Sequence, residues 1–464
     1  MKRKHDKLGH ASINKLLINL SLPSMVAMFA NAIYNIVDTI FVGRGVGALG
    51  IGAVAIVLPI MAIVSSFAHL VGIGTATLMS RQLGAGKEDR VNQIAGNGMM
   101  MIILVGIFFT VIGEVFTEPL LKAFGATEGI LPYAHDFARV IFIGMLWFPF
   151  CVSTSNYLRA EGNARDAMNA MILGIVVNTI LDYIFIFPLD MGIHGAALAT
   201  IIGKFTTLLY LVHYFSSSKS IIRVRWHHFK IKKDILKPTI SVGLSGFGHR
   251  SSSSLANVAL NHSLGFYGGD MAIAVFGVIY KITLFLGMPL FGLNQGMQPI
   301  VGYNFGAGKY DRILRTIRLG FTYSLIYGVL AITLFEIFPR QIFSLFTTES
   351  QLIREGTHAM KIILSMMWLL GITISTTGIH QAMGKARSAF VMSVLRWVLL
   401  IVPLILILPR IGGLGLDGIW LAFPIADASA AGIAILLLNK TLRHSGVRLG
   451  LFRMNRRLKT KTNP

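Results

Sequence analysis

The sequence has little charge and almost no cysteine. Charged residues make up 13% of its 464 positions, and Cys151 is its one cysteine. A typical soluble domain carries about 25% charged residues, so this composition excludes a soluble globular protein, a disordered chain and a coiled coil. A single cysteine also excludes a disulfide framework and a cysteine-based metal cluster. Hydrophobic residues, in contrast, account for 54% of the chain, which predicts a membrane protein with many spans.

Common catalytic and nucleotide-binding motifs are also absent. The sequence contains no H-E-x-x-H zinc motif, no G-x-x-x-x-G-K-[ST] phosphate loop and no G-x-S-x-G nucleophile elbow. An intramembrane enzyme would need a nucleophile–base pair or a metal triad at helical spacing. Neither is present, so we predict that the chain is not an enzyme. Without an ATP site, uphill transport has to draw on an ion gradient, so H⁺ or Na⁺ is expected and no cofactor.

Twelve apolar stretches are long enough to cross a bilayer as helices, each of which needs about 20 residues. The first begins near Leu16 and continues to about Val42. It is too long for the core of a signal peptide and lacks a clear cleavage site, so we interpret it as an uncut span. The expected fold class is an all-α membrane protein. The predicted spans are 16–42, 51–80, 94–117, 132–155, 167–188, 194–215, 237–262, 271–300, 313–339, 355–382, 388–408 and 418–439.

Acidic residues are scarce, since 20 Asp and Glu stand against 42 Lys and Arg. The loops that follow even-numbered spans, with adjoining span residues and the two ends of the chain, account for 32 of these basic residues. The odd loops and adjoining span edges hold 7, and the other 3 lie inside spans. Cytoplasmic loops carry such an excess of Lys and Arg, so we predict that both termini are cytoplasmic. The basic surplus therefore reflects topology and contact with membrane lipid, and we expect no nucleic-acid partner.

Two halves of the sequence repeat each other. Residues 84–90 match 306–312, and residues 160–165 match 382–387, both at an offset of 222, while 192–195 match 415–418 at an offset of 223. Three ordered matches indicate a duplication of six spans, and halves with an even number of spans share one orientation. We therefore predict two pseudo-symmetric six-helix lobes around a central cleft. The predicted parts are a first lobe (1–215), a basic cytoplasmic linker (216–236), a second lobe (237–445) and a basic cytoplasmic tail (446–464).

Carboxylates inside the first-lobe spans are the main candidates for function, because a charge in the bilayer is costly and tends to be functional. In span 1, Asn35 and Asp38 share a helix face and Tyr34 precedes Asp38 by four residues, while Asn178 and Asp182 share a face of span 5. Oxygen ligands from Asp38, Asp182 and Asn178 could hold Na⁺, or one carboxylate could take a proton. The alternative is an interhelical hydrogen-bond network that only fixes packing.

The second-lobe spans also contain charges. Asp427 in span 12 corresponds to Lys204 in span 6 at an offset of 223, and Arg250 and Lys281 lie in spans 7 and 8. These charges could change partners during a cycle, or form a static salt bridge such as Lys281 with Asp427. The sequence leaves the partner of Asp427 open. Pro23 in span 1 removes one helical hydrogen bond and is a candidate hinge.

The chain resembles a bacterial member of the MATE family, the multidrug and toxic compound extrusion transporters. The resemblance rests on the twelve-span plan, the loop 80–86 (SRQLGAG), its repeat 302–308 (GYNFGAG) and the segment 160–163 (AEGN). It implies an antiporter of the bacterial inner membrane that exports small amphiphilic or cationic compounds in exchange for H⁺ or Na⁺. We expect the chain to work as a monomer.

Within the family, the acidic residues resemble the DinF-like branch. That resemblance implies a first-lobe site made of Pro23, Asp38, Asn178 and Asp182, with Asn156 and Thr200 nearby. The NorM-like branch uses second-lobe acids in spans 7 and 10, and this sequence has no Asp or Glu in the interior of either span. The competing hypothesis is a flippase for a lipid-linked oligosaccharide, for which Lys204, Arg250 and Lys281 would supply a cationic cleft.

Overall fold

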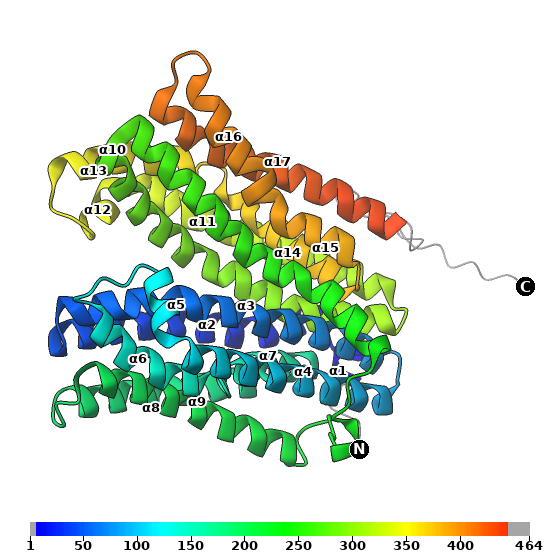
Figure 1. The fold of residues 1–464 in the computed structure, drawn as a ribbon. Helices are drawn as coiled ribbons and strands as arrows, with labels where there is room; N and C mark the ends of the chain where they lie inside the picture. Colours follow the sequence, from blue (N-terminus) through cyan, green and yellow to red (C-terminus); the bar gives the residue numbers. More distant parts are fainter. Residues whose placement is uncertain (1–5, 444–464) are drawn as a thin grey trace, which may run out of the picture.

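The structure is a computed structural model that describes residues 6–443, and its secondary structure over that range is helical. Two groups of helices lie side by side in Figure 1, one from each half of the sequence. The helices of the first lobe are α1 (Asp6–His10), α2 (Ile13–Gly45), α3 (Ala48–Gly84), α4 (Glu88–Val115), α5 (Thr117–Ala123), α6 (Leu131–Gly144), α7 (Phe148–Ala160), α8 (Ala164–Ile186) and α9 (Gly192–Ser216).

The second lobe follows the linker, which contains the short helix η1 (Trp226–His228). The last membrane-crossing helix before α17 contains a π-helical turn at η3, where each backbone hydrogen bond spans one residue more than in an α-helix. The helices of the second lobe are α10 (Lys233–Gly306), α11 (Tyr310–Ile337), α12 (Pro339–Ser344), α13 (Ser350–Leu364), η2 (Met367–Leu369), α14 (Leu370–Ala382), α15 (Ala386–Val394), η3 (Leu395–Ile401), α16 (Val402–Ile407), η4 (Leu408–Arg410) and α17 (Gly415–Arg443).

Helix α10 is two spans joined by a tight reversal. Its 74 residues are interrupted at Gly269, whose φ of 63° lies in the left-handed region that favours glycine. Both of its ends pack against α3, since a Cβ on Gly74 would meet the backbone of Thr239 and one on Gly84 would meet that of Tyr303. The two arms therefore run antiparallel and correspond to the predicted spans 7 and 8.

The described residues supply twelve crossings. Nine helices of residues 6–443 are long and apolar enough to span a membrane, and two bent pairs raise that number to 11. The two arms of α10 count as one of these helices, so separating them gives the twelfth crossing. The bent pairs are α6 with α7, at 44°, and α13 with α14, at 41°.

The duplication is visible in the backbone. Helices α4 and α11 begin and end at positions 222 residues apart, and so do α7 and α14. The turns repeat as well, because Gly86 and Gly308 have φ values of 72° and 67°, and Gly162 and Gly384 have 83° and 71°. A left-handed turn needs glycine in both copies, which explains why these short motifs survive in the sequence.

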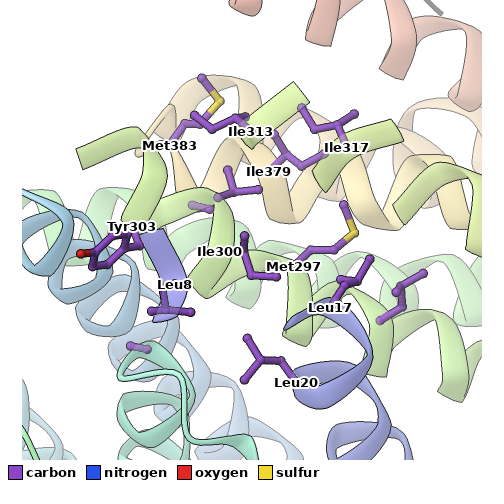
Figure 2. Packing of buried hydrophobic residues seen from close by; sticks show 14 of the residues in the cluster. Leu8, Leu17, Leu20, Met297, Ile300, Tyr303, Ile313, Ile317, Ile379 and Met383 are labelled. Atoms are coloured by element: carbon purple, nitrogen blue, oxygen red, sulfur yellow. The ribbon is translucent and has the colours of Figure 1, made fainter. Parts of the chain in front are cut away.

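The lobes share one hydrophobic core at the end of the bundle that carries the basic loops, which we call the basic end. There Leu8, Leu17 and Leu20 of the first lobe pack with second-lobe residues such as Met297 and Ile300 (Figure 2). At the opposite end the buried clusters separate, and residues 42–201 form one while residues 256–426 form the other. The lobes are thus joined at the basic end and packed independently at the other.

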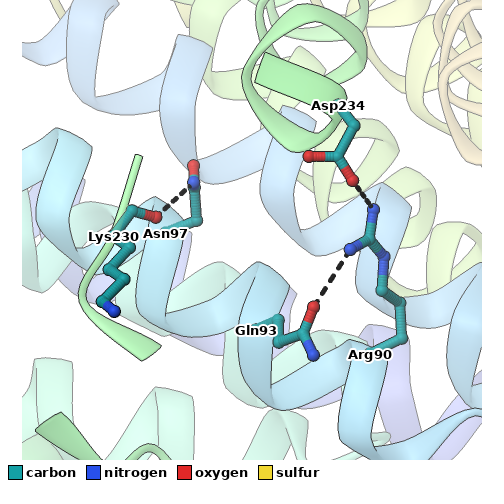
Figure 3. Close-up of polar contacts among 5 residues, drawn as sticks. All are labelled: Arg90, Gln93, Asn97, Lys230 and Asp234. Atoms are coloured by element: carbon teal, nitrogen blue, oxygen red, sulfur yellow. Dashed lines mark hydrogen bonds and ion pairs between the residues drawn. The ribbon is translucent and has the colours of Figure 1, made fainter. Parts of the chain in front are cut away.

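The linker is docked on the first lobe. Asn97 of α4 donates to the carbonyl of Lys230 at 2.7 Å, and Arg90 bridges Gln93 and Asp234 (Figure 3). Buried Glu161 accepts from the Ser220 hydroxyl at 2.7 Å and from two backbone amides of the linker. Burial raises the pKa of Glu161, although these donors act in the opposite direction. The predicted tail, 446–464, lies outside the described residues.

Candidate functional site

Three helices of the first lobe bring polar side chains together in a cluster. Helix α2 carries Tyr34 and Asp38, while α8 carries Asn178 and Asp182 one turn apart. Helix α9 adds Thr200 and Lys204, which are also one turn apart. We call these six residues the first-lobe cluster. The sequence predicted five of these residues for one site and Lys204 only as a charge that could change partners, and the three helices place all six near one another.

Small residues let α8 and α9 approach closely enough to form this cluster. A Cβ on Gly203 would lie 2.6 Å from the Cβ of Asn178, and one on Gly174 would lie 2.0 Å from the Thr207 hydroxyl oxygen. Real Cβ atoms do not tolerate such distances, so a larger residue at either position would separate the helices. Glycine in membrane helices commonly permits such close packing. In this protein the two glycines allow Asn178, and Asp182 one turn further along α8, to lie close to α9.

The carboxyl groups of Asp38 and Asp182 interact directly. The two carboxyl groups are close enough to influence each other, and Lys204 is the cation that acts on Asp38. The Lys204 ammonium also lies 5.9 Å from the centre of the Tyr34 ring and 5.8 Å from that of Phe148. Aromatic faces attract cations at such distances, so Lys204 is held at the edge of the acidic pair.

The interior of the cluster is short of hydrogen-bond partners. Asp182 is 1% exposed and Asn178 is 3% exposed. Among the described residues, Asp182 Oδ1 and both amide atoms of Asn178 have no hydrogen-bond partner. More than nine in ten buried polar atoms in proteins are satisfied, so three such atoms in adjacent turns of one helix are unusual. A small ligand could supply the contacts that these oxygen and nitrogen atoms lack.

Two residues predicted at this site lie elsewhere. Asn35 is exposed and donates to the carbonyl of Asn31 at 2.7 Å, on its own helix. Asn156 lines a cavity between the lobes and accepts from Arg159 at 3.4 Å. Spacing along one helix fixes a shared face, but it does not fix which side chains turn toward their own backbone or toward a different neighbour.

The predicted hinge, Pro23, is buried in the middle of α2 at the contact with the second lobe. A Cβ on Gly292 would lie 2.5 Å from the Met25 side chain, and one on Gly296 would lie 2.2 Å from the Ser21 hydroxyl oxygen. Helix α2 is continuous from Ile13 to Gly45 despite the proline. Pro23 is therefore placed where a bend of α2 would change the contact between the lobes.

The second-lobe charge pair differs from the prediction. Asp427 of α17 is bound by Arg396 through two hydrogen bonds, of which Nη2 to Oδ2 is 3.2 Å, and the Arg396 guanidinium lies 4.8 Å from the centre of the Trp397 ring. Lys281 is exposed, and Arg250 contacts His69 across the cleft at 3.4 Å. Arg396 lies inside the predicted span 388–408, but it was not among the predicted partners of Asp427.

Comparison with known proteins identifies the family. The MatE family model matches residues 23–184 and 249–407, which together exceed half of the chain. The chain belongs to the MATE family. As a MATE protein it is a membrane transporter rather than an enzyme, and MATE transporters are ion-coupled antiporters.

Two relatives are similar over nearly the whole chain. The multidrug export protein MepA of Staphylococcus haemolyticus is 27% identical over 427 residues, which cover 92% of this MATE protein and 93% of MepA. MepA of Staphylococcus aureus (strain MRSA252) is 27% identical over 425 residues, with 91% and 93% covered.

Solved structures confirm the fold. A multidrug resistance MATE transporter in an outward-facing conformation superimposes with a TM-score of 0.90 at 24% identity, covering 96% of this chain and 99% of that one. A transporter of the MOP superfamily from Pyrococcus furiosus gives the same TM-score and identity, with 96% and 100% covered. The predicted all-α membrane fold, with twelve helices in two lobes, is therefore confirmed.

The described residues contain no side-chain cluster typical of a metalloenzyme. Within residues 6–443, no three His, Cys, Asp or Glu side chains are close enough to hold a metal ion. The first-lobe cluster offers two carboxylates and one amide oxygen instead, and hard cations such as Na⁺ accept oxygen ligands of both kinds.

Proposed function

We propose that this MATE protein exports small amphiphilic or cationic compounds in exchange for H⁺ or Na⁺. The observation that carries the proposal is the group of buried atoms without partners in the first-lobe cluster, Asp182 Oδ1 and the side-chain amide of Asn178. Leaving such atoms unsatisfied is costly, so they favour a site that a small cation completes during transport. The MepA relatives, which are named as multidrug export proteins, support export and drug-like substrates.

The coupling ion is bound between Asp38 and Asp182 in this proposal. A proton would be shared by the two carboxyl groups, since two neighbouring carboxylates cannot both remain ionised cheaply. Na⁺ would take oxygen ligands from Asp38, Asp182 and Asn178. Either cation would compete with the Lys204 ammonium for Asp38, because Lys204 is the cation within range of that carboxylate in the present state. Ion binding thereby releases a contact between α2 and α9.

Alternating access follows from the packing of the lobes. The basic loops are assigned to the cytoplasm by their charge, with both termini on that side. The shared core at the basic end then closes the cytoplasmic face, and the separate cores leave the lobes free at the outer face. The likeness to an outward-facing MATE structure supports this assignment. An ion or substrate shifts the equilibrium by its difference in affinity between the two states.

Several finer assignments belong to the same proposal. The first-lobe acids support placement in the DinF-like branch. We also propose that the chain acts as a monomer in the inner membrane of a bacterium. The lobes are bounded at 215 and 237, with the linker between them. The export relatives favour drug efflux over the flippase hypothesis.

The test is efflux of a fluorescent organic cation from proteoliposomes under an imposed pH or Na⁺ gradient. We expect one gradient to drive transport by the native chain, and that gradient names the ion. Asp38→Asn and Asp182→Asn should each reduce coupled efflux roughly a hundredfold, because a lost ionic contact of about 3 kcal/mol corresponds to that factor.

The matched control is Asp166→Asn, which changes an acid of α8 near the basic end that Tyr210 binds at 2.8 Å. It should leave coupling intact. Coupled efflux that survives both changes in the first-lobe cluster would contradict the proposed ion site, and a native chain that moves no organic cation would contradict drug export.

A further inference from the structure

The first helix of the chain, α1, is held by side chains of the second lobe. Arg312 Nη2 donates to the carbonyl of Leu8 at 3.1 Å and to that of Ala11 at 2.7 Å. Lys309 Nζ donates to the carbonyl of Gly9 at 3.1 Å. The last carbonyl groups of a helix lack partners within the helix and attract cations. Two cations of α11 and the loop before it therefore bind the carbonyl end of a first-lobe helix.

Further polar contacts strengthen this attachment. Asn304 is fully buried, and its Nδ2 donates to the carbonyl of Leu8 at 3.0 Å while its Oδ1 accepts from Arg312 Nε at 3.0 Å. The Tyr323 hydroxyl donates to Asn14 Oδ1 at the start of α2. Hydrogen bonds from charged donors are stronger than those between neutral groups. Directional contacts thus join the start of the first lobe to the second lobe, in addition to the shared core.

The side chain of Leu8 is enclosed between the lobes and is 1% exposed. Leu8 and Tyr303 belong to the shared core (Figure 2), and a Cβ on Gly9 would lie 2.8 Å from the Tyr303 ring. On the first-lobe side, a Cβ on Gly162 would lie 3.3 Å from Leu8 Cδ2. Opening of the basic end would separate Gly162 from Tyr303, so α1 cannot keep both contacts.

The connection between α1 and α2 allows little independent movement. Only Ala11 and Ser12 lie between the two helices, and an extended residue spans at most about 3.5 Å. Helix α1 therefore cannot stay on the second lobe once the start of α2 has moved more than a few ångströms away with the first lobe. The contact between Arg312 and the carbonyl of Ala11 then has to break.

The duplication supplies a second copy of the arginine contact. Arg90 corresponds to Arg312 at the offset of 222, and its partner Asp234 corresponds to Ser12. Arg90 binds Asp234 at the start of α10, just as Arg312 binds the residues that precede α2. In each repeat, the arginine that follows the Gly-Ala-Gly loop thus binds the segment leading into the first helix of the other repeat.

The two copies differ in how their bound segments are held. The segment before α10 is also fixed to the first lobe, by Asn97 at Lys230 and by Glu161 at Ser220. Loss of Arg90 would leave those contacts in place. Helix α1 instead lies between the lobes, and its polar attachment comes from the second lobe.

We propose that α1 is a clasp that holds the basic end closed, and that Arg312 is the residue that positions it. Release of α1 from Arg312 and Lys309 accompanies opening of the basic end, so the strength of these contacts sets the balance between the two facing states. The inference deepens the proposed alternating access, on which it rests, by naming contacts that break during the cycle. It also gives the repeated loop a role in the closed state.

The separation of the lobes at the basic end tests the clasp. Spin labels at Arg165→Cys and Arg387→Cys, which are exposed repeat counterparts at the starts of α8 and α15, are read by double electron–electron resonance in a Cys151→Ser background. We expect Arg312→Gln to raise the ratio of long to short label distances about tenfold, because both of its bonds to α1 are lost. Arg312→Lys keeps a donor with a charge and should recover part of the shift.

The matched control is Arg90→Gln, the same change at the repeat counterpart. It should leave the distance distribution as in the native chain, because Asn97 and Glu161 still hold the segment before α10. Thermal unfolding of each variant is followed on the same preparation to show that the chain is folded. Equal shifts in Arg90→Gln and Arg312→Gln, or no shift in Arg312→Gln, would overturn the inference.

A reversible cross-link tests whether α1 has to leave the second lobe. The side chains of His10 and Lys309 meet at 3.4 Å, so His10→Cys with Lys309→Cys can be joined by a short bis-methanethiosulfonate reagent in proteoliposomes. Ion-driven efflux should stop on cross-linking and recover when dithiothreitol cleaves the link, whereas each single variant should keep its efflux after the same treatment. Efflux that continues through complete cross-linking would show that α1 is not a clasp.

Failure of the clasp can be told from failure of drug export. If an ion gradient drives efflux by the native chain while Arg312→Gln leaves the label distances unchanged, the transport function stands and the clasp is wrong. If the native chain transports no organic cation but Arg312→Gln alone lengthens the label distance, the clasp stands and the proposed drug export fails.

Discussion

The two lobes share a backbone plan but treat buried charge in opposite ways. In the second lobe, Asp427 is 1% exposed and bound by Arg396 through two hydrogen bonds. In the first lobe, Asp182 is equally buried, yet one of its oxygens has no partner and its nearest charged neighbour is another acid, Asp38. The second lobe thus holds a completed ion pair, whereas the first lobe holds two neighbouring acids and polar atoms without hydrogen-bond partners.

The difference is clearest at one repeat position. Lys204 and Asp427 correspond at an offset of 223 and lie on α9 and α17, the last helices of their lobes. Lys204 reaches toward Asp38 across an open acidic cluster, whereas Asp427 is closed by a guanidinium. A duplicated scaffold can therefore keep its helices and turns while one copy pairs its buried acid with a cation and the other leaves an acidic pair without one.

The largest effect on stability is expected from breaking the ion pair between Arg396 and Asp427. Arg396→Met leaves the Asp427 carboxylate buried and alone, which should lower the free energy of unfolding by about 3–5 kcal/mol. The double change Arg396→Met with Asp427→Leu removes both charges and should recover most of that loss. Thermal unfolding of the purified protein measures both variants, and a double variant as unstable as the single one would show that the pair is not a closed unit.

The next largest effect on stability is expected at a helix contact that occurs in the same form in both lobes. A Cβ on Gly84 would lie 1.9 Å from the carbonyl oxygen of Tyr303, and one on Gly306 would lie 1.9 Å from that of Arg81. The two contacts are copies of each other, because both pairs are related by the offset of 222. Gly84→Ala and Gly306→Ala should each cost about 1–3 kcal/mol through overpacking, and by similar amounts.

The glycine changes act on the closed basic end, so they should shift the lobes toward the state in which that end opens. Double electron–electron resonance between labels at Arg165→Cys and Asp311→Cys, in a Cys151→Ser background, reports the separation. The label distance should lengthen in both variants. A change in one variant alone would mean that the symmetry of the contact does not extend to its energy.

A smaller effect on stability is expected in the first-lobe cluster, although transport there depends on the same residue. Asp182→Asn removes a carboxylate that has no cation in the present state, so the free energy of unfolding should change by less than about 1 kcal/mol or rise. Arg396→Met, in contrast, is expected to lower the free energy of unfolding substantially. A loss as large as that of Arg396→Met would place Asp182 in a structural network instead of an ion site.

The smallest effect on stability is expected for Pro23→Ala. Alanine can restore the helical hydrogen bond that proline lacks, so stability should stay the same or rise slightly, while efflux should fall severalfold if α2 bends at this point. Efflux of the organic cation and thermal unfolding are measured on the same preparation. Unchanged efflux would show that the contact between the lobes does not depend on a bend at Pro23.

Much of the fold could be predicted from the sequence because a bilayer restricts the solutions. Twelve apolar stretches and a repeated Gly-Ala-Gly loop correctly indicated twelve helices in two lobes. The one merged pair, α10, was separated by the polar segment around Gly269. Helical spacing correctly grouped Asn178 with Asp182, since residues four apart share a face.

Contacts between helices were the part that spacing could not supply. The sequence offered Lys281 as the partner of Asp427, but Arg396 holds it, and a buried acid in span 12 was the signal that could have prompted a search for a cation inside span 11. Asn156 lines a cavity between the lobes together with Arg159, although its residue type suited the ion site equally well. Which faces meet depends on the rotation of each helix, and that is set by packing.

The π-helical turn Leu395–Ile401 records an event in the history of the chain. Copies in the two lobes are 222 residues apart up to Ala386 and 223 residues apart from Gly415 onward, so the second lobe gained one residue, or the first lost one, in between. A π-turn takes one residue more than an α-turn and absorbs such an insertion without moving the helix ends. Arg396 sits within that turn, so the one-residue difference between the two copies coincides with the place where the second lobe presents a cation to Asp427.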